Sequence, residues 1–409
     1  MDFWLILFII DWVLFGIVSL TVLYMLFFAI MALFYHKPDL PKSKHKNRFI
    51  VLIPTYKNPD VIYTVKSILG QTYPQRLFDV TVISDQCDEM TNFRLAQEPI
   101  TLLTPKFERS TKAKELQLAI NNLPQFKIYD VVVVLDGGSA VEPEFLEQTN
   151  DAFEAAGTKA IQMHRLSRNR DTVTARMGAV FEEINNSIFR RGHVNLGLSA
   201  SLSGGGNAYD FNWFKRNIFN VKTPWEVKEL ESLLVRQNIY VDYFDQIYVF
   251  DEKKRSSEAF NKERKRWIKA HYNAFLRNVM YLPGALLNQQ YNLIDKIIQW
   301  LILPRLVMMA IIIIMSLIMP MIYMSLVFKW WAAFALVLFI CAMATPDYLV
   351  DEHWDSTFFK SPLVFMKNIP GLSKVADYLE EKMSEREKRA KEKAKEKKNK
   401  KEKNKKSRR

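Results

Sequence analysis

The sequence predicts an α/β domain with a mostly parallel central sheet, attached to transmembrane helices. Apolar runs rich in Val and Ile alternate with amphipathic stretches between residues 48 and 250. Such runs, without alternation to polar residues, are typical of strands buried on both faces, as in parallel sheets covered by helices. Two other stretches, 3–34 and 297–344, are apolar enough to cross a hydrocarbon core of ~30 Å.

The first apolar stretch predicts an uncleaved membrane anchor over residues 1–35. Asp11 is its only charged residue, and Trp12 to Phe34 carry no charge. A cleaved signal peptide is the rival interpretation, but it would start with basic residues and have a shorter apolar core. The start Met1-Asp2-Phe3 therefore favours the anchor.

The second apolar stretch predicts two transmembrane helices within residues 297–345. Ile297 to Met319 forms one span with Arg305 inside it, and Pro320 interrupts the pattern. The weaker remainder is either a short second span or a re-entrant hairpin. As a span it runs to Thr345 and starts at Ala332 or nearer Phe328, with Lys329, Trp330 and Trp331 as interfacial markers.

Three spans predict that residues 36–296 and the C-terminal tail lie on the cytoplasmic side of the inner (plasma) membrane, as parts of a multi-pass protein. Basic residues gather in 42–48 and in the tail, as expected for cytoplasmic segments. The tail 385–409 holds fifteen Lys or Arg and five Glu, which accounts for +10 of the net charge of +13. We expect a disordered tail that serves topology and solubility or binds anionic lipid, after a cytoplasmic amphipathic segment over 346–384. The tail lacks aromatic residues, so nucleic acid is not an expected partner.

The soluble part predicts strands at 49–56, 79–85 and 130–136, with helices at 59–74 and 112–123 between them. In doubly wound sheets, ligands bind at the carboxyl ends of the strands. The residues at these ends are Pro54, Thr55, Tyr56, Asp85 and Asp136. We expect Asp136 to contact a ligand, although it can also cap the turn that follows it.

Several segments in a fixed order resemble a known enzyme family. They are VLIPTYKNPDVIYTVKSILGQTYP, VISDQCD, STKAKELQLAI, VVVVLDGGSAVEPEFL, SLSGGGNAYD, KTPWEVKELESLLVRQNIYVDYFDQIYVFDEK and ERKRW. Residues 48–345 thereby resemble the membrane-anchored family 2 glycosyltransferases, which include bacterial synthases of cellulose and hyaluronan. The resemblance implies a nucleotide-diphospho-sugar transferase (GT-A) fold for residues 36–296, and a nucleotide-diphospho sugar as donor, with a UDP-sugar favoured.

The resemblance also implies a set of site residues. Donor and nucleotide contacts fall on Pro54, Thr55, Tyr56, Asp85, Lys112, Lys114, Asp136, Arg264 and Arg266. Acceptor contacts fall on Gly204, Gly205, Gly206 and Trp267. Asp136 would hold a divalent cation, Mg²⁺ or Mn²⁺, that stabilises the departing diphosphate.

Two departures from the family pattern affect the chemistry. Asp136-Gly137-Gly138 stands where the family has Asp-x-Asp, so the second acid is missing. The Thr-Glu-Asp triplet with the catalytic base aligns with Trp225-Glu226-Val227, or, after a shift of two residues, with Val227-Lys228-Glu229. The candidates for the base are therefore Glu229 and Glu226.

The expected function is an inverting transfer of a sugar to a glycan or lipid-linked acceptor in cell-surface polysaccharide synthesis. If the enzyme is active, Asp136 acts with another acid, such as Glu226, Glu229 or Glu142. The alternatives are binding without turnover, and a non-catalytic glycosyltransferase-like subunit or scaffold beside other synthase subunits.

Overall fold

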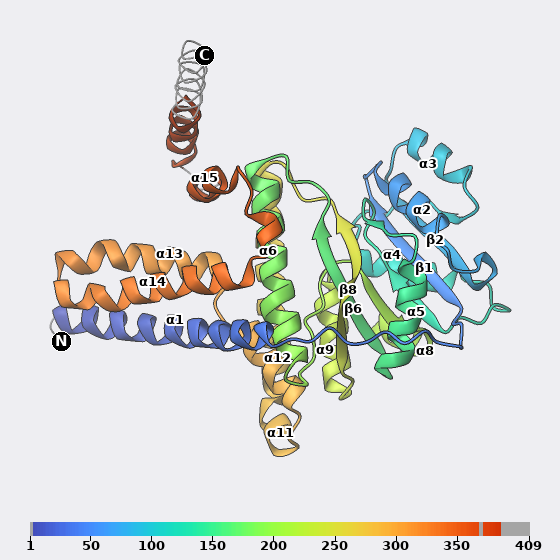
Figure 1. Ribbon diagram of the computed structural model, residues 1–409, viewed down its shortest axis with the longest axis horizontal. Coiled ribbons are helices and arrows are strands. Elements are labelled where there is room, and N and C mark those ends of the chain that lie inside the picture. Colours follow the sequence, from blue (N-terminus) through green and yellow to red (C-terminus); the bar gives the residue numbers. More distant parts are fainter. Residues whose placement is uncertain (1–2, 368–370, 386–409) are drawn as a thin grey trace, which may run out of the picture.

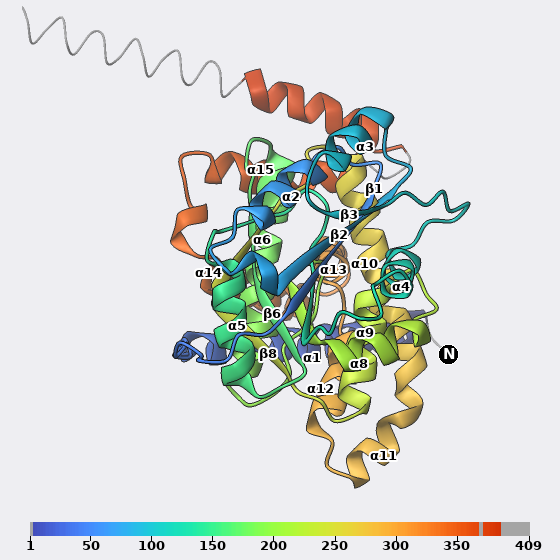
Figure 2. The same cartoon turned by 90° about the vertical axis from the view of Figure 1, so that its right-hand side faces the viewer.

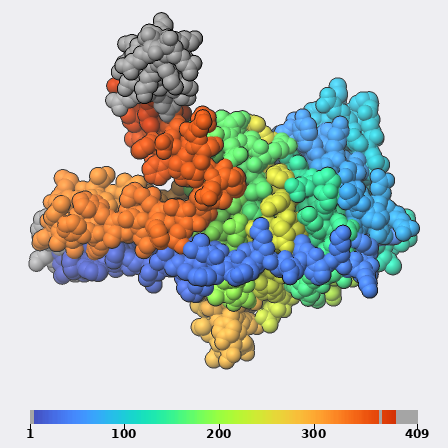
Figure 3. Space-filling view, viewed as in Figure 1, coloured from blue at the N-terminus to red at the C-terminus, as the bar shows by residue number. Residues whose placement is uncertain are grey.

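The computed structural model describes residues 3–367 and 371–385 of the chain. An α/β domain lies at one end of the molecule and a bundle of long helices at the other (Figure 1). The extended segment 35–48 runs along the outside of the α/β domain and joins the first helix to the first strand (Figure 3).

The α/β domain is built on one eight-stranded sheet with the order β3-β2-β1-β4-β7-β6-β8-β5. β1 pairs in parallel with β2 and β4, as do β2 with β3 and β6 with β8, whereas β7 is antiparallel to its neighbours and β5 to β8. This confirms the predicted mostly parallel sheet. The strands are β1 (Phe49–Tyr56), β2 (Phe78–Asp85), β3 (Thr101–Leu103), β4 (Val131–Val134), β5 (Ala140–Val141), β6 (Ala160–Ser167), β7 (Asn207–Asp210) and β8 (Val241–Asp251).

Helices cover both faces of the sheet, which explains the uninterrupted apolar strands. Phe49 and Val51 of β1 face one hydrophobic core, and Ile50 and Leu52 face the other. The first core is closed by α2 (Val61–Leu69), α3 (Glu89–Ala96) and α5 (Phe145–Ala156); the second by α4 (Lys112–Asn121), α8 (Phe211–Asn217) and α9 (Glu226–Arg236). The view along the molecule in Figure 2 separates these two layers.

The helical bundle consists of α1 (Phe3–Leu33), α13 (Arg305–Ile318) and α14 (Met324–Ala344), which lie side by side in Figure 1. Within the described residues, two helices are long and apolar enough to cross a membrane, Leu5–Leu33 and Met324–Ala344. A third candidate is a pair, Tyr291–Leu301 and Arg305–Met321, bent by 48°.

The bundle corrects two predictions about residues 297–345. The predicted span from Ile297 to Met319 is not one continuous helix, because Pro304 precedes α13 and cannot extend the helix that ends at Leu301. The last helix starts earlier than expected, at Met324. Trp330 lies inside it and is fully buried against the bundle.

A layer of helices separates the bundle from the sheet (Figure 1). It contains α6 (Val173–Asn186), which continues through a π-helical turn, Ser187–Arg191, into α7 (Gly192–Val194), and then α10 (Ser257–Asn278), α11 (Leu282–Leu287) and α12 (Tyr291–Leu301). Gly192 allows α1 to pack closely, because a Cβ atom there would lie 2.2 Å from the carbonyl oxygen of Phe28. α15 (Trp354–Met366) and a helix over 373–385 fall in the predicted amphipathic segment, and residues 386–409 of the predicted tail lie outside the described part.

Candidate active site

The carboxyl ends of β1, β2 and β4 bring the first group of predicted residues to one edge of the sheet. Tyr56 pairs in register with Asp85, and Asp136 follows β4 by two residues. Thr55 and Asp85 are buried, and Thr55 Oγ1 and Asp85 Oδ2 have no hydrogen-bond partner among the described residues. Because buried oxygens without a partner are rare, this edge has the character of a ligand site.

Asp136 is held by three donors from different parts of the chain. Lys112 Nζ lies 2.5 Å from its Oδ1, the Gly205 amide donates to its Oδ2 at 2.7 Å, and Arg165 Nη2 lies 3.6 Å from the same oxygen. Burial by itself would raise the pKa of Asp136, but the charges of Lys112 and Arg165 outweigh it and lower that pKa. The carboxylate therefore stays ionised at neutral pH.

Arg165 lies between two carboxylates at the ends of β4 and β8. Its Nε and Nη2 atoms lie 2.6 Å and 2.5 Å from Asp251 Oδ2, and Ser139 donates to Asp251 Oδ1 at 2.6 Å. Arg165 Nη1 also approaches Ser203 Oγ at 3.3 Å. The guanidinium thus bridges Asp251 and Asp136 and forms one wall of the site.

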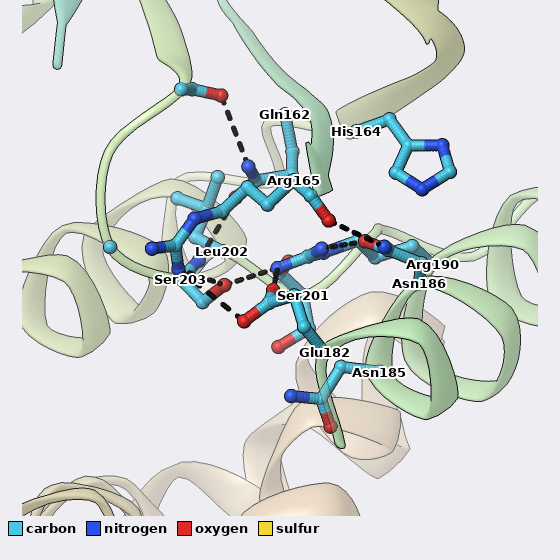
Figure 4. Close-up of polar contacts among 12 residues, drawn as sticks. Gln162, His164, Arg165, Glu182, Asn185, Asn186, Arg190, Ser201, Leu202 and Ser203 are labelled. Atoms are coloured by element: carbon cyan, nitrogen blue, oxygen red, sulfur yellow. Dashed lines mark hydrogen bonds and ion pairs between the residues drawn. The ribbon is translucent and has the colours of Figure 1, made fainter. Parts of the chain in front are cut away.

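The Arg165 wall continues into a buried polar network that reaches the helical layer. Figure 4 shows Arg165 and Arg190 converging on Ser203 from opposite sides, with Glu182 beneath them. Arg190 Nη2 lies 3.1 Å from Glu182 Oε1, and Lys253 Nζ lies 3.3 Å from Glu182 Oε2. Paired in this way, each charge compensates the desolvation of its partner.

The structure places the two candidate bases in different surroundings. Glu226 begins α9, is 8% exposed, and its Oε1 lies 3.7 Å from Lys112 Nζ, so it belongs to the Asp136 site. Burial raises the pKa of Glu226. Glu229 accepts hydrogen bonds from the backbone and hydroxyl of Thr223 and an ion pair from Arg277 at 3.1 Å, and therefore holds the loop before α9 in place.

The predicted glycine segment contacts the same edge of the sheet. A Cβ atom on Gly205 would lie 2.5 Å from the backbone nitrogen of Asp136, and one on Gly204 would lie 2.3 Å from Arg165 Nη1. Gly204 and Gly206 also have positive φ angles of +51° and +75°. Glycine is required here because the loop passes directly over Asp136.

The residues of the ERKRW segment lie on α10 and do not all face the site. Arg264 packs over the rings of Phe181 and Phe260, and its Nε has no hydrogen-bond partner among the described residues. Arg266 is exposed, and its charge lowers the pKa of Glu226 against the larger effect of burial.

Trp267 lines a cavity of about 220 Å³ between the α/β domain and the helical bundle. Ser203 and Arg190 line the same cavity, so it adjoins the Arg165 network. The side of the cavity that faces the helical bundle is apolar and includes Met25 of α1 and Pro304. The cavity therefore leads from the bundle toward the carboxylate site.

Two predicted donor residues lie further out. Lys114 is exposed and donates to the Arg109 carbonyl at 3.0 Å; it lies two residues after Lys112 on α4, about half a turn away. Tyr56 is 49% exposed and its hydroxyl lies 3.4 Å from Gln86 Oε1. Pro54, one residue before Thr55, is buried inside β1.

The donor set does not fit a divalent cation. Within the described residues there is no cluster of three His, Cys, Asp or Glu side chains able to hold a metal ion. Asp136 already has a cation or an amide on each oxygen, and Gly138 supplies no second carboxylate. Mg²⁺ prefers six oxygen ligands, and a cation placed here would be repelled by Lys112 and Arg165.

Sequence reasoning missed Arg165, Asp251, Glu182 and Lys253. Arg165 sits near the carboxyl end of β6, and Asp251 is the last residue of β8. A charged residue at the end of an apolar strand is the signal that could have identified both.

Comparison with known proteins agrees with this architecture. A family model described as glycosyltransferase like family 2 matches residues 46–270. No curated protein matches the chain. A mannosyltransferase, PcManGT from Pyrobaculum calidifontis in complex with GDP-Man and Mn²⁺, is 13% identical with a TM-score of 0.52, over 80% of this chain and 97% of that one. S. aureus TarS 1-349 in complex with UDP-GlcNAc is 14% identical with a TM-score of 0.42, over 83% of this chain and 92% of that one.

The family match spans more than half of the chain, and the likeness to the mannosyltransferase structure shows a shared fold. The matched region contains β1 to β8, the Asp136 site and most of α10. The chain therefore belongs to glycosyltransferase family 2 and is a transferase with a GT-A fold.

Proposed function

We propose that this protein is a membrane-bound, inverting glycosyltransferase that moves a sugar from a nucleotide-diphospho donor to a glycan or lipid-linked acceptor in cell-surface polysaccharide synthesis. We place α1, α14 and the bent pair across the inner membrane, with the α/β domain in the cytoplasm. The cavity at Trp267 supports the acceptor assignment, because it joins the helical bundle to the site.

The observation that carries the proposal is the pair of buried, unpartnered oxygens on Thr55 and Asp85 beside the Asp136 site. A base and ribose offer donors to such oxygens, and Lys112 and Arg165 offer charge to a diphosphate. In the neighbouring mannosyltransferase and TarS structures the bound molecules are GDP-Man and UDP-GlcNAc, which supports a nucleotide-sugar donor here.

The transfer step follows from the placement of Glu226. The acceptor hydroxyl oxygen bonds to the anomeric carbon as the bond between that carbon and the diphosphate oxygen breaks. The electron pair of the broken bond leaves with the nucleoside diphosphate, and the hydroxyl proton passes to Glu226. Its raised pKa makes Glu226 a stronger base than an ordinary carboxylate.

The test compares Glu226→Gln with Glu229→Gln in purified protein. We expect Glu226→Gln to lower transfer or donor hydrolysis by about 10²- to 10⁴-fold, the usual contribution of a general base, while UDP or GDP binding is retained. Glu229→Gln should mainly lower thermal stability, because Glu229 holds the loop at Thr223.

A non-catalytic subunit is the second candidate, favoured by Gly138 and Val227 at the two positions where the family has acids. Nucleotide binding without turnover by folded protein, with any acceptor offered, would support this candidate. Absence of UDP and GDP binding would refute the donor site itself.

A further inference from the structure

Arg165 lies between Asp136 and Asp251, and its Nη2 atom is within ion-pair distance of both carboxylates. We propose that Arg165, together with Lys112, replaces the metal ion at the donor diphosphate, so that this enzyme binds its donor nucleotide without a divalent cation. The proposal rests on the proposed function, since it concerns the same donor site.

The guanidinium of Arg165 is held in position by contacts with several side chains. Two of its nitrogens contact Asp251 at 2.5 Å and 2.6 Å, and Asp251 is held in turn by Ser139. Glu182 approaches from the other side at 3.8 Å. Because this cation is in position before the ligand binds, no reorganisation energy is needed when negative charge develops on the leaving group.

The loop over the site packs directly against this arginine. Gly204 packs against the guanidinium so closely that a Cβ atom would lie 2.3 Å from Nη1. Arg165 keeps 12% of its side chain exposed and Lys112 keeps 17%, so both can reach a phosphate from the open side. Since Nε and Nη2 of Arg165 already contact Asp251, Arg165 would act on the diphosphate mainly through its positive charge, and Lys112 adds a second charge.

The missing second acid agrees with this arrangement. An Asp at position 138 would serve a metal ion, but without a metal it would repel the diphosphate. Gly138 removes that repulsion and has a φ of +98°, which favours glycine. At the end of β4 the site thus has one carboxylate, Asp136, where the family has two, and Lys112 and Arg165 pair with it.

The charges around the site also oppose a metal ion. Lys112, Arg165, Arg190 and Lys253 balance the four carboxylates Asp136, Glu226, Asp251 and Glu182 within ion-pair distance. A divalent cation would add two positive charges to a balanced cluster, whereas a diphosphate brings the negative charge that the exposed sides of Lys112 and Arg165 attract.

The first experiment is calorimetric titration of UDP and of GDP into the full-length, detergent-solubilised protein, once with EDTA and once with Mn²⁺ or Mg²⁺. We expect the affinity of the better nucleotide to agree within about threefold under all conditions. Binding that appears only with metal would overturn the inference and leave the proposed function standing. Binding of neither nucleotide under any condition would overturn both.

The second experiment is Arg165→Met, which removes the cation between Asp136 and Asp251. We expect affinity in EDTA to fall by about 10- to 100-fold, as for a lost charge-assisted contact. Added Mn²⁺ should recover part of the loss, since the two carboxylates no longer share a positive charge and repel a cation less. Arg165→Lys should keep metal-free binding within about tenfold of the wild type, because it retains the charge.

The matched control is Arg168→Met, the same substitution three residues away, where Arg168 pairs with Glu252 at 3.2 Å at the surface. It should bind like the wild type in EDTA. Thermal unfolding of each variant separates a folding defect from a binding defect. Unchanged metal-free affinity in folded Arg165→Met would contradict the proposed role of Arg165.

Discussion

His164 lies directly before Arg165 on β6 and shows how buried charge is compensated in this domain. Its Nε2 lies 2.8 Å from Glu183 Oε1, and its Nδ1 lies 2.8 Å from Asp245 Oδ1. Burial would lower the pKa of His164, but the hydrogen bonds to Asp245 and Glu183 prevail and raise it to about 9. The imidazolium therefore persists at neutral pH, and it links β6 to α6 and β8.

This ion pair predicts a loss of stability at alkaline pH. The pKa of His164 rises on folding from its ordinary 6.5, so the stabilisation is complete below about pH 6.5 and is lost as pH rises toward 9. The loss corresponds to about 3 kcal/mol. Thermal unfolding of detergent-solubilised protein at pH 6, 7.5 and 9.5 measures it.

The controls are His164→Gln and His36→Gln. His164→Gln should unfold at a lower temperature at pH 6 and lose less between pH 6 and 9.5, whereas exposed His36 should behave like the wild type. An identical pH dependence in His164→Gln and the wild type would count against the assignment.

The loop between Ser203 and β7 is the element that closes the active site. Its Gly205 amide donates to Asp136, and its Gly204 backbone packs on Arg165. β7, which follows this loop, pairs with β4 in the antiparallel sense. The loop therefore reaches Asp136, at the end of β4, from the neighbouring strand of the sheet. The position of Asp136 therefore depends on a turn about 70 residues later in the chain.

The substitution Gly205→Ala in this loop should disrupt the active site. The added Cβ atom would lie 2.5 Å from the Asp136 backbone nitrogen, which cannot move without shifting β4. We expect a loss of about 1–3 kcal/mol in stability, typical of overpacking, and at least a tenfold loss of UDP or GDP affinity. Thermal unfolding and calorimetry measure the two effects.

The matched control is Gly284→Ala in α11, where a Cβ atom meets nothing within 4 Å. Alanine favours a helix, so this variant should be as stable as the wild type or slightly more stable. Equal nucleotide affinity in Gly205→Ala and Gly284→Ala would show that the loop does not shape the site.

In the molecule as a whole, a buried charged residue connects α1 with α14, which are far apart in the sequence. Asp11 of α1 is fully buried and accepts hydrogen bonds from Lys329 and, at 2.8 Å, from Trp330 Nε1, both on α14. Charged groups within apolar helices are costly unless they are paired. The pair therefore orients the first and last long apolar helices relative to each other.

Asp11→Leu should destabilise the bundle by about 3–5 kcal/mol, because it leaves Lys329 buried without its partner. The double variant Asp11→Leu/Lys329→Leu should recover most of this loss, since paired charges are replaced by packed apolar groups. Thermal unfolding in mild detergent compares the two. If the double variant is no more stable than Asp11→Leu, the broken ion pair does not explain the loss of stability.

The local elements and the family could be predicted from the amino-acid sequence. Apolar runs at 49–56 and 79–85 predicted β1 and β2, and the apolar stretch at 3–34 predicted α1, because burial on both faces and a lipid solvent each leave a local pattern. The strand ends also placed Asp85 and Asp136 at one edge of the sheet. Domain boundaries and residue roles stay predictions.

Which charged side chains meet depends on the folded chain and could not be predicted from the sequence. Arg165, Asp251 and Asp136 end strands that are far apart in sequence, and their distances depend on the order of those strands in the sheet. Glu226 and Glu229 are both acids at the start of α9, so no local pattern separates them, yet one faces Lys112 and the other Thr223. Interactions between distant segments have no local periodicity, and so the folded chain alone reveals them.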